Sequence, residues 1–583
     1  MPRAFRTVSP RPAARAQGPA DMARAGHVYP QVEPGVEAVM DRRVVGVAPG
    51  VPVTRALRRA RAAGAAIVVL GRRSAVRAAE LATAAAWGFG ARPARDVAWR
   101  DLPTVGRRAT EVAVRRRLLA GASLVLVQGG RGIVGAVDAH RCPVLPAESS
   151  VLPQLERGGD RQAEARFWLL RVAGKVGEGL GSPAYAVGGV VRDLLLGAAP
   201  PDVDLVVEGD GVAFARRLAE EIGGTLLVHG SFGTASIEGG HAPASAGLDG
   251  VALGRVDIAS ARRERYAAAG ALPDVEPAGL LEDLRRRDFS VNALAVALAP
   301  DRFGRLIDPL GGLPDIRARR LRALRPLAFV EDPTRIVRAA RYAARLGLGA
   351  DTATRAGIRT GIAWGPYPAL SGQRLWRELE LVGTEPRARH AFELLVRWRA
   401  ARLWNGGLLS TGHLRAAERF ARWARDAGVA VDPAELFVIA LLVGEPPAGV
   451  ERALDRLALS GEPRARIEAG ALTGPLARRL DGARLRPSEV DEALAATPET
   501  AALAAWLCGG PRARRRIEWY LASGRAVRPR LRGADLLALG VPRGPRVGEA
   551  LGMLRRRRLD GDLGSLAEER DLVKEWLTSG KEA

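Results

Sequence analysis

The stretch from Tyr185 to Gly197 reads Tyr-Ala-Val-Gly-Gly-Val-Val-Arg-Asp-Leu-Leu-Leu-Gly, and it predicts a short strand that turns into a helix at two glycines. Gly188 and Gly189 let the backbone approach a phosphate closely, and the free N–H groups of a new helix then point at that phosphate. Any tight strand-to-helix turn favours glycine, so the two glycines alone could serve the turn without binding a phosphate. The neighbouring motifs are needed to choose between a structural turn and a phosphate-binding turn.

The next predicted strand carries two carboxylates, in the order Asp202-Val-Asp204-Leu-Val-Val. Residues two apart on a strand leave the same face, so both side chains can bind one cation. Hard carboxylate oxygens beside a phosphate-binding turn suit Mg²⁺. Asp257, on a later predicted strand, is the best candidate for a third acid. The sequence therefore predicts a Mg²⁺ site formed by Asp202, Asp204 and Asp257.

Length and composition indicate a globular protein with a polyanionic partner. The chain has 583 residues, of which 47% are hydrophobic and 26% charged, and its formal net charge is +24. Three or four domains are expected at this length. The positive charge favours nucleic acid as a partner, although nearly all basic residues are arginine, as coding drift would also produce.

Other features exclude several classes of protein. No apolar run approaches the ~18 residues needed to span a bilayer, so no membrane association is expected. Two cysteines, Cys142 and Cys508, provide neither a disulfide framework nor a zinc-finger spacing, and no signal segment opens the chain. We expect a cytoplasmic enzyme.

One pattern occurs twice near the N-terminus: a threonine, an Arg/Ala-rich helix, a glycine and a buried strand. The copies begin at Thr54 and Thr110, and they predict an internal pair of α/β units. The pair resembles tandem CBS domains, which often hold an adenine nucleotide between two such units. The Ser/Thr-x-x-Asp pattern of nucleotide-binding members is missing at Ser74–Arg77 and Ala136–Ala139. A structural or tRNA-facing spacer is therefore the alternative to an adenine nucleotide site.

Six motifs in the central part of the chain occur in a fixed order. They are Gly188-Gly189 with Arg192-Asp193, the Asp202/Asp204 pair, His229-Gly-Ser-Phe-Gly-Thr-Ala235, Arg286-Arg-Asp-Phe-Ser-Val-Asn-Ala-Leu-Ala295, Asp308-Pro-Leu-Gly-Gly312 and Glu331-Asp-Pro-Thr-Arg-Ile-Val-Arg338. This order resembles the class II tRNA nucleotidyltransferase and bacterial poly(A) polymerase family, from about Ala184 to Leu348. The resemblance implies nucleotidyl transfer from ATP, or also CTP, to the 3′ acceptor end of tRNA.

The resemblance also implies which residues bind the nucleotide. In the family, the Arg286–Ala295 motif contacts the ribose and triphosphate, while its apolar members can equally form a core. The full nucleotide-binding set expected here is Gly188, Gly189, Arg192, Arg287, Asp288, Asn292, Asp332, Arg335, Arg338 and Arg341.

Asp332 and Arg335 form the expected base-reading pair. At i and i+3 in a first helical turn they would present an acceptor and a forked donor on one side. Adenine and cytosine each present an amino donor beside a ring-nitrogen acceptor, which this pair matches, whereas guanine and uracil present the reverse. Glu331 is expected to hold Arg335 or a neighbour in place, and Arg338 and Arg341 to reach phosphates of the triphosphate or of the RNA.

The substrate alternatives stay open at this point. The segment after Asp257 resembles the loop of a CBS-fused, often A-adding subgroup, and the Gly-Arg-Arg-Phe signature of poly(A) polymerases is replaced by Leu226-Leu-Val-His-Gly-Ser-Phe232. Addition of A alone and of full CCA are both compatible with the sequence. Poly(A) synthesis and a catalytically degenerate adenylate sensor are the rivals.

The expected fold is multidomain, with an α/β CBS-like pair, an α+β nucleotidyltransferase head resembling polymerase β, and an all-α RNA-binding array. The expected boundaries are a flexible basic leader (1–43), tandem CBS-like domains (44–145), a linker helix (146–182), the catalytic head (183–325), nucleotide-template neck helices (326–400), and a helical body and tail that bind tRNA (401–583).

Overall fold

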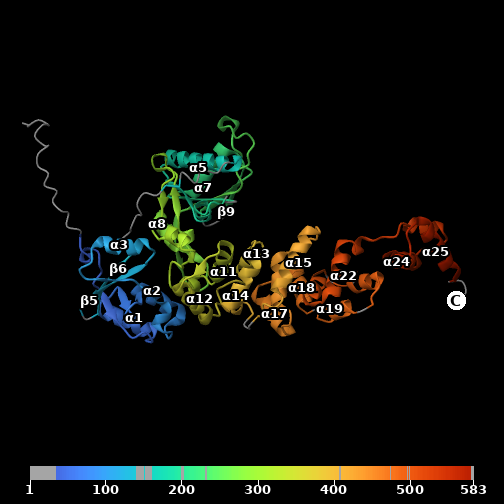
Figure 1. The fold of residues 1–583 in the computed structure, drawn as a ribbon. Coiled ribbons are helices and arrows are strands. Elements are labelled where there is room, and N and C mark those ends of the chain that lie inside the picture. Colours follow the sequence, from blue (N-terminus) through green and yellow to red (C-terminus); the bar gives the residue numbers. More distant parts are fainter. Residues whose placement is uncertain are drawn as a thin grey trace, which may run out of the picture.

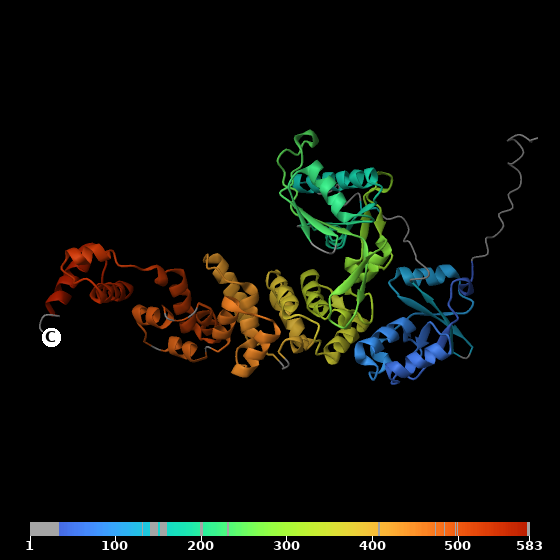
Figure 2. The ribbon, with the colours of Figure 1, turned by 180° about the vertical axis from the view of Figure 1, so that it is seen from behind.

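The computed structural model describes residues 34–130, 132–139, 150–151, 160–198, 202–229, 233–405, 409–472, 474–482, 484–495, 497 and 499–579. Cys142, most of the predicted leader and residues 230–232 of the His229–Ala235 motif lie outside these ranges. The chain forms an elongated row that runs from the N-terminal repeats to the C-terminal helices, and a head stands off one side of this row (Figures 1 and 2). No helix in the described ranges is long and apolar enough to cross a membrane.

A seven-stranded sheet forms the head, in the order β15-β14-β7-β8-β11-β10-β9. The strands are β7 (Ala184–Val187), β8 (Val203–Val207), β9 (Thr225–His229), β10 (Thr234–Glu238), β11 (Val256–Ser260), β14 (Ala295–Ala297) and β15 (Leu306–Ile307). β8 and β11 pair in parallel, and the other neighbours are antiparallel. The strands predicted at Tyr185, at Asp204 and at Asp257 are confirmed as β7, β8 and β11.

Helices α5 (Arg161–Gly179) and α7 (Gly211–Ile222) cover one face of this sheet (Figure 1). Asp210 caps α7 by accepting from the backbone N–H groups of Val212 and Ala213, which would otherwise lack partners. Phe214 and Leu218, one turn apart, are fully buried. Helix α5 lies within the segment predicted as a linker helix (146–182), and it packs its apolar face against the head.

A two-stranded hairpin leads from the head to the neck. It consists of β12 (Arg262–Tyr266) and β13 (Pro273–Pro277), and α8 (Leu280–Arg286) follows it. From the sequence, this segment is expected to be a loop. The five residues of β12, Arg-Arg-Glu-Arg-Tyr, carry polar groups, and alternate positions are partly buried and exposed, as in a strand whose two faces lie near solvent or polar groups.

The N-terminal part consists of two units with the same topology, which confirms the predicted internal pair. The first has β1 (Val44–Gly46), α1 (Val53–Ala62), β2 (Ile67–Val69) and β3 (Ala75–Arg77); the second has β4 (Thr104–Gly106), α3 (Glu111–Leu119), β5 (Leu124–Gly129) and β6 (Gly132–Asp138). In each unit the first two strands are parallel and the last two antiparallel. Helix α2 (Ala78–Ala84) and the short segment η2 (Ala85–Phe89) connect them.

Residues 34–43 are part of this fold, so the leader predicted for 1–43 is wrong at its C-terminal end. Val36 is fully buried in a cluster with Val105, Val114 and Val125. The backbone N–H of Asp41 donates to the carbonyl of Ala136 at 2.8 Å. Burial of an apolar side chain and this pairing together order the segment.

From Gly312 to the C-terminus the described chain is almost wholly helical, as predicted. Beside two-residue strands β16 (Arg320–Leu321) and β17 (Gly349–Ala350), the neck contains α9 (Gly312–Arg317), α10 (Ala328–Glu331), α11 (Thr334–Leu346), α12 (Thr352–Trp364), α13 (Gly372–Gly383) and α14 (Ala388–Arg397). The body and tail contain α15 (Leu414–Asp426), α16 (Pro433–Leu442), α17 (Pro447–Arg456), α18 (Gly461–Ala471), α19 (Gly474–Asp481), α20 (Pro487–Ala495), α21 (Glu499–Cys508), α22 (Pro511–Ala522), α23 (Gly533–Ala538), α24 (Pro545–Leu559) and α25 (Leu566–Ser579).

Candidate active site

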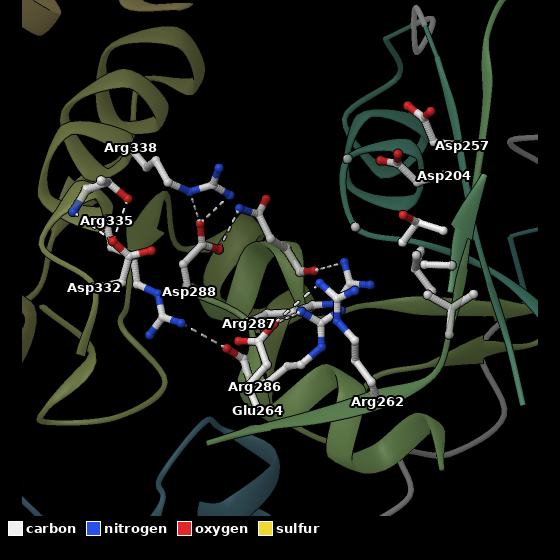
Figure 3. A pocket seen from close by; sticks show the side chains of 18 of the residues that line it. Asp204, Asp257, Arg262, Glu264, Arg286, Arg287, Asp288, Asp332, Arg335 and Arg338 are labelled. Carbon is white, nitrogen blue, oxygen red and sulfur yellow. Dashed lines mark hydrogen bonds and ion pairs between the residues drawn. The ribbon is translucent and has the colours of Figure 1, made fainter. Parts of the chain in front are cut away.

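A cavity of about 810 Å³ lies between the head sheet and helix α11. Its walls come from β7, β8, β10, β11, the β12–β13 hairpin, α11 and α13, so the head and the neck both contribute (Figure 3). Eleven arginines and six carboxylates line it. The excess of arginine makes the cavity suited to a polyanionic ligand.

The glycine turn forms one wall of the cavity. Gly188 has φ of +68°, a left-handed conformation that favours glycine, and it precedes helix α6 (Gly189–Leu195). A Cβ atom on Gly188 would lie 2.7 Å from Nη1 of Arg287. The absence of a side chain therefore lets an arginine lie against the turn, where both can face a phosphate.

Two carboxylates meet opposite this turn. Asp204 on β8 and Asp257 on β11 are register partners on adjacent parallel strands, and Figure 3 shows both side chains facing the cavity. Burial, together with the nearby charges of Asp257 and Asp202, raises the pKa of Asp204 to about 6, although Arg287 and Arg192 oppose this shift. A cation beside Asp204 would favour its charged form.

Two neighbouring side chains donate hydrogen bonds to one carboxylate oxygen of Asp257. Ser236 Oγ donates to Asp257 Oδ1 at 2.5 Å, and Arg255 Nε donates to the same oxygen at 2.9 Å. His229 Nε2 lies 2.7 Å from Ser236 Oγ. Sequence reasoning missed Ser236 and Arg255. The signal for Ser236 was its place on a strand that pairs with the strand of Asp257.

Asp202 lies apart from this pair. It is exposed, precedes β8 and does not line the cavity. Among the residues that the structure describes, no group of three or more His, Cys, Asp or Glu side chains is arranged to hold a metal ion. The structure thus brings together two of the three predicted ligands, and Asp202 as a ligand stays a prediction.

The Arg286–Ala295 motif provides both a core and a polar network. Phe289, Val291 and Leu294 are fully buried. Asn292 Nδ2 donates to Asp288 Oδ1 at 3.1 Å, and Arg192 Nη1 donates to Asn292 Oδ1 at 2.6 Å. The apolar members of the motif therefore form the core, as one interpretation predicted, while the polar members line the cavity. Contact of these polar members with the nucleotide stays a prediction.

Asp288 connects this network to helix α11. Arg338 Nε donates to Asp288 Oδ2 at 2.8 Å. Burial alone would raise the pKa of Asp288, but the charge of Arg338 and its hydrogen bonds outweigh burial and lower this pKa. Arg338 also lies 3.3 Å from Glu378, and Arg341 lies 3.7 Å from the same carboxylate and 3.6 Å from Glu385.

Asp332 and Arg335 both line the cavity, but their local structure differs from the prediction. Helix α11 begins at Thr334, so Asp332 precedes the helix in an extended conformation and is not on its first turn. Asp332 Oδ1 accepts from the backbone N–H and the hydroxyl of Thr334. Pro333 is the N-cap residue of α11, so the helix begins one residue later than it would with Asp332 as the cap.

Each member of this pair has its own partners. Arg335 is 5% exposed and donates to Glu331 Oε2 at 3.1 Å, as predicted, and to the hydroxyl of Tyr266 at 3.1 Å. Arg374 Nη2 lies 2.9 Å from Asp332 Oδ1, and Arg374 Nη1 donates to the carbonyl of Gly270 at 2.8 Å. Tyr266 and Arg374 were missed as site residues.

Comparison with known proteins identifies the class of this site. Residues 184–322 match the family described as "Poly A polymerase head domain". The chain is 34% identical over 422 residues to the CC-adding tRNA nucleotidyltransferase of Deinococcus radiodurans, covering 72% of this chain and 96% of that protein. It is 34% identical over 425 residues to the A-adding tRNA nucleotidyltransferase of Geobacter sulfurreducens, covering 69% of this chain but 46% of that protein.

Solved structures agree with these relatives. An apo CCA-adding enzyme superposes with a TM-score of 0.63 at 27% identity, covering 74% of this chain and 99% of the other. The Thermotoga maritima CCA-adding enzyme complexed with tRNA superposes with a TM-score of 0.58 at 26% identity, with the same coverage. The head and site thus define a nucleotidyltransferase.

The chain belongs to the tRNA nucleotidyltransferase family, which confirms the resemblance stated from the motifs. It spans less than half of the Geobacter protein and 25% of the A-adding enzyme of Aquifex aeolicus, to which it is 40% identical over 216 residues.

Proposed function

We propose that this chain adds AMP from ATP to the 3′ end of tRNA and so completes the CCA terminus. The observation that carries the proposal is the Asp204–Asp257 pair facing the Gly188–Gly189 turn inside an arginine-lined cavity. Two carboxylates opposite a phosphate-binding turn suit nucleotidyl transfer. The relatives support tRNA as the substrate, because they are named A-adding and CC-adding tRNA nucleotidyltransferases.

The site residues fit a divalent cation. Asp204 and Asp257 offer hard oxygen donors on adjacent strands, and a cation between them would offset the cost of burying the charge of Asp204. Mg²⁺ is the ion we propose, with Asp204 and Asp257 as ligands and Asp202, which precedes β8 outside the cavity lining, as the proposed third ligand. When bound, it would activate the 3′-hydroxyl of tRNA and neutralise charge on the triphosphate.

The remaining residues have roles in binding and orientation. The turn at Gly188 and Gly189, with Arg287 against it, binds the triphosphate through N–H groups and a guanidinium. Arg192, Asp288 and Asn292 form one hydrogen-bonded network that positions the ribose. Arg338 and Arg341 place two further charges on the α11 side of the cavity.

Base selection falls to Asp332 and Arg335. The carboxylate of Asp332 accepts from an exocyclic amino group, and the guanidinium of Arg335 donates to a ring nitrogen, so adenine and cytosine are accepted together. One solved CCA-adding enzyme is complexed with CTP and another with ATP. We therefore keep CMP addition as a second activity to test at the same site.

The rest of the chain is proposed to position the RNA. The head and neck form the catalytic part, the helices from residue 401 onward bind the tRNA, and the N-terminal pair is a CBS-like module whose two units share one β-α-β-β topology. An adenine nucleotide bound to that module is a separate prediction, to be tested by calorimetry with ATP and AMP. tRNA as substrate calls for a cytoplasmic enzyme.

A primer-extension gel tests this function. Three tRNAs, lacking all three terminal nucleotides, ending in CC and ending in CCA, are incubated with ATP, CTP or both. We expect one AMP on the tRNA ending in CC and no extension of the complete tRNA. Efficient CTP incorporation into the shortest tRNA shows full CCA addition, and long A tails on any RNA show a poly(A) polymerase. Binding of ATP with no label in RNA would show an adenylate sensor.

A further inference from the structure

Tyr266 links the base-reading arginine to the β12–β13 hairpin. Arg335 Nη2 donates to the Tyr266 hydroxyl at 3.1 Å, and this hydroxyl donates to Glu264 Oε2 at 2.9 Å. The oxygen thus accepts from the guanidinium and donates to a carboxylate whose side chain is 8% exposed. A hydroxyl constrained on both sides fixes the position of the group that donates to it.

The same residue contacts the N-terminal pair through its backbone. Trp87, in η2, donates its indole N–H to the carbonyl oxygen of Tyr266 at 3.2 Å, across 179 residues of sequence. Tyr266 therefore lies between a tryptophan of the N-terminal unit and an arginine of the active-site cavity. A change in the position of Trp87 would therefore shift Tyr266, and Tyr266 would in turn shift its hydrogen-bond partner Arg335.

The segment that carries Trp87 is packed against the neck. Phe89, two residues on, packs against Trp364 of α12 with ring centroids 4.5 Å apart. The hydroxyl of Thr54 donates to the carbonyl of Gly90 at 3.0 Å, and that of Thr360 donates to the carbonyl of Asp96 at 3.3 Å. The segment that follows α1 is thus docked on the neck beside the hairpin, and residues Ala94–Val97 contact α12. Figure 1 shows the first unit next to this part of the neck.

We infer that Tyr266 is a positioning residue for base selection, and that the N-terminal pair takes part in selection because Trp87 holds Tyr266. The inference rests on the proposed function and assigns this pair a role that needs no bound ligand. Arg335 can present its donors to a ring nitrogen only in one orientation. Glu331 and the carbonyl of Ala328 hold Nη1 of Arg335, whereas Nη2 is held by the Tyr266 hydroxyl and the carbonyl of Arg286. Without the Tyr266 hydroxyl, Nη2 keeps one of its two partners, and its direction toward the base is less strictly fixed.

The test compares full-length Tyr266→Phe and Trp87→Phe with the wild type. Each variant removes one hydrogen-bonding group and keeps an aromatic ring. The readout is the ratio of kcat/KM for ATP to that for UTP on tRNA ending in CC. We expect this ratio to fall ~tenfold in Tyr266→Phe, since a hydrogen bond to a charged group is lost, and ~threefold in Trp87→Phe. The double variant should show no larger loss than Tyr266→Phe, because both changes act through one contact.

Two matched controls separate positioning from general damage. Tyr185→Phe removes a hydroxyl that bonds Glu208 away from the cavity, and Trp99→Phe alters an indole of the same N-terminal part whose buried N–H has no hydrogen-bond partner. Both should keep the wild-type ratio. Thermal melting of all variants checks folding, and Trp87→Tyr serves as a second variant if Trp87→Phe melts early.

The outcomes are separable. An unchanged ratio in Tyr266→Phe overturns the positioning role. A normal ratio in both Trp87 variants, or full additivity in the double variant, overturns the part of the N-terminal pair. No AMP incorporation by the wild type would instead contradict the proposed function.

Discussion

Asp204 and Asp257 stand directly opposite each other on the parallel strands β8 and β11, and both carboxylates face one arginine-lined cavity. This register depends on the whole head sheet, because β8 and β11 are brought together only after β9 and β10 have turned back along the edge. Burial is the main cause of the raised pKa of Asp204, and the neighbouring charge of Asp257 adds to it. This pair is where we propose that nucleotidyl transfer takes place.

Replacing either carboxylate should abolish transfer. We expect Asp204→Ala and Asp257→Ala each to lower turnover by ~1,000-fold or more, since preorganised charge at the reacting centre is lost, and Asp202→Ala to do the same if it completes the metal shell. tRNA affinity should change little. Single-turnover AMP incorporation and filter binding measure the two quantities, with the exposed head residue Asp249→Ala as control. More than about a tenth of wild-type turnover in Asp204→Ala would contradict the assignment.

Base selectivity should depend on Asp332 and Arg335. Asp332→Ala and Arg335→Ala should each relax discrimination against UTP and GTP by ~10-fold, because one hydrogen-bonded base contact is worth about 1 to 3 kcal/mol. Arg377→Ala is the control, since this arginine lines the cavity with a side chain that is 73% exposed. Competition between ATP and UTP on one tRNA measures the ratio. Equal slowing with all four nucleotides would mean that the pair is structural.

RNA binding should be electrostatic and should involve the tail. Arg512 and Arg515 on α22 are exposed and line a groove of about 390 Å³ with Trp519. The logarithm of tRNA affinity should fall with the logarithm of salt with a slope of magnitude ~3 or more, and each Arg→Ala change in α22 should reduce this magnitude by about 0.7 to 0.9. Arg58→Ala, on the exposed face of α1, should leave it unchanged. A flat salt response would mean that the net charge reflects composition alone.

Asp283 should stabilise the fold in a pH-dependent way. Burial alone would raise its pKa, but Arg287 and Arg286 outweigh burial and lower this pKa. The ionised carboxylate therefore contributes its full stability above the unfolded pKa of about 3.9 and loses it as the pH falls through the lower folded value. Asp283→Asn should cost about 3 kcal/mol at pH 7, because two partly buried arginines lose their shared carboxylate partner.

Urea unfolding at pH 7, 5 and 3.5 measures this effect. The difference between the wild type and Asp283→Asn should be constant from pH 7 to 5 and should shrink at pH 3.5. Asp274→Asn, at an exposed position of β13, should show no such difference. A difference that grows toward low pH would contradict the sign of the shift.

Local patterns in the sequence predicted much of the fold and the site. The glycine turn and the carboxylate strand follow from short-range patterns, and the structure has them where expected. The cavity collects every predicted nucleotide-binding residue. Such motifs are recognisable because their backbone geometry is local.

Features that depend on tertiary packing could not be predicted in this way. Helix α5 looked like a linker because nothing in its sequence shows that the sheet lies beneath it. Val36 looked like part of a leader because its burial depends on strands about 70 to 90 residues away. Tyr266 and Trp87 meet across 179 residues, so neither signals the other.

The most direct measurement is incorporation of labelled AMP into tRNA ending in CC, followed at single-nucleotide resolution with the wild type and Asp204→Ala side by side. The account predicts one added nucleotide with the wild type, no further extension, and none with Asp204→Ala. Absence of label in the RNA with the wild type, or equal incorporation by both proteins, would contradict it.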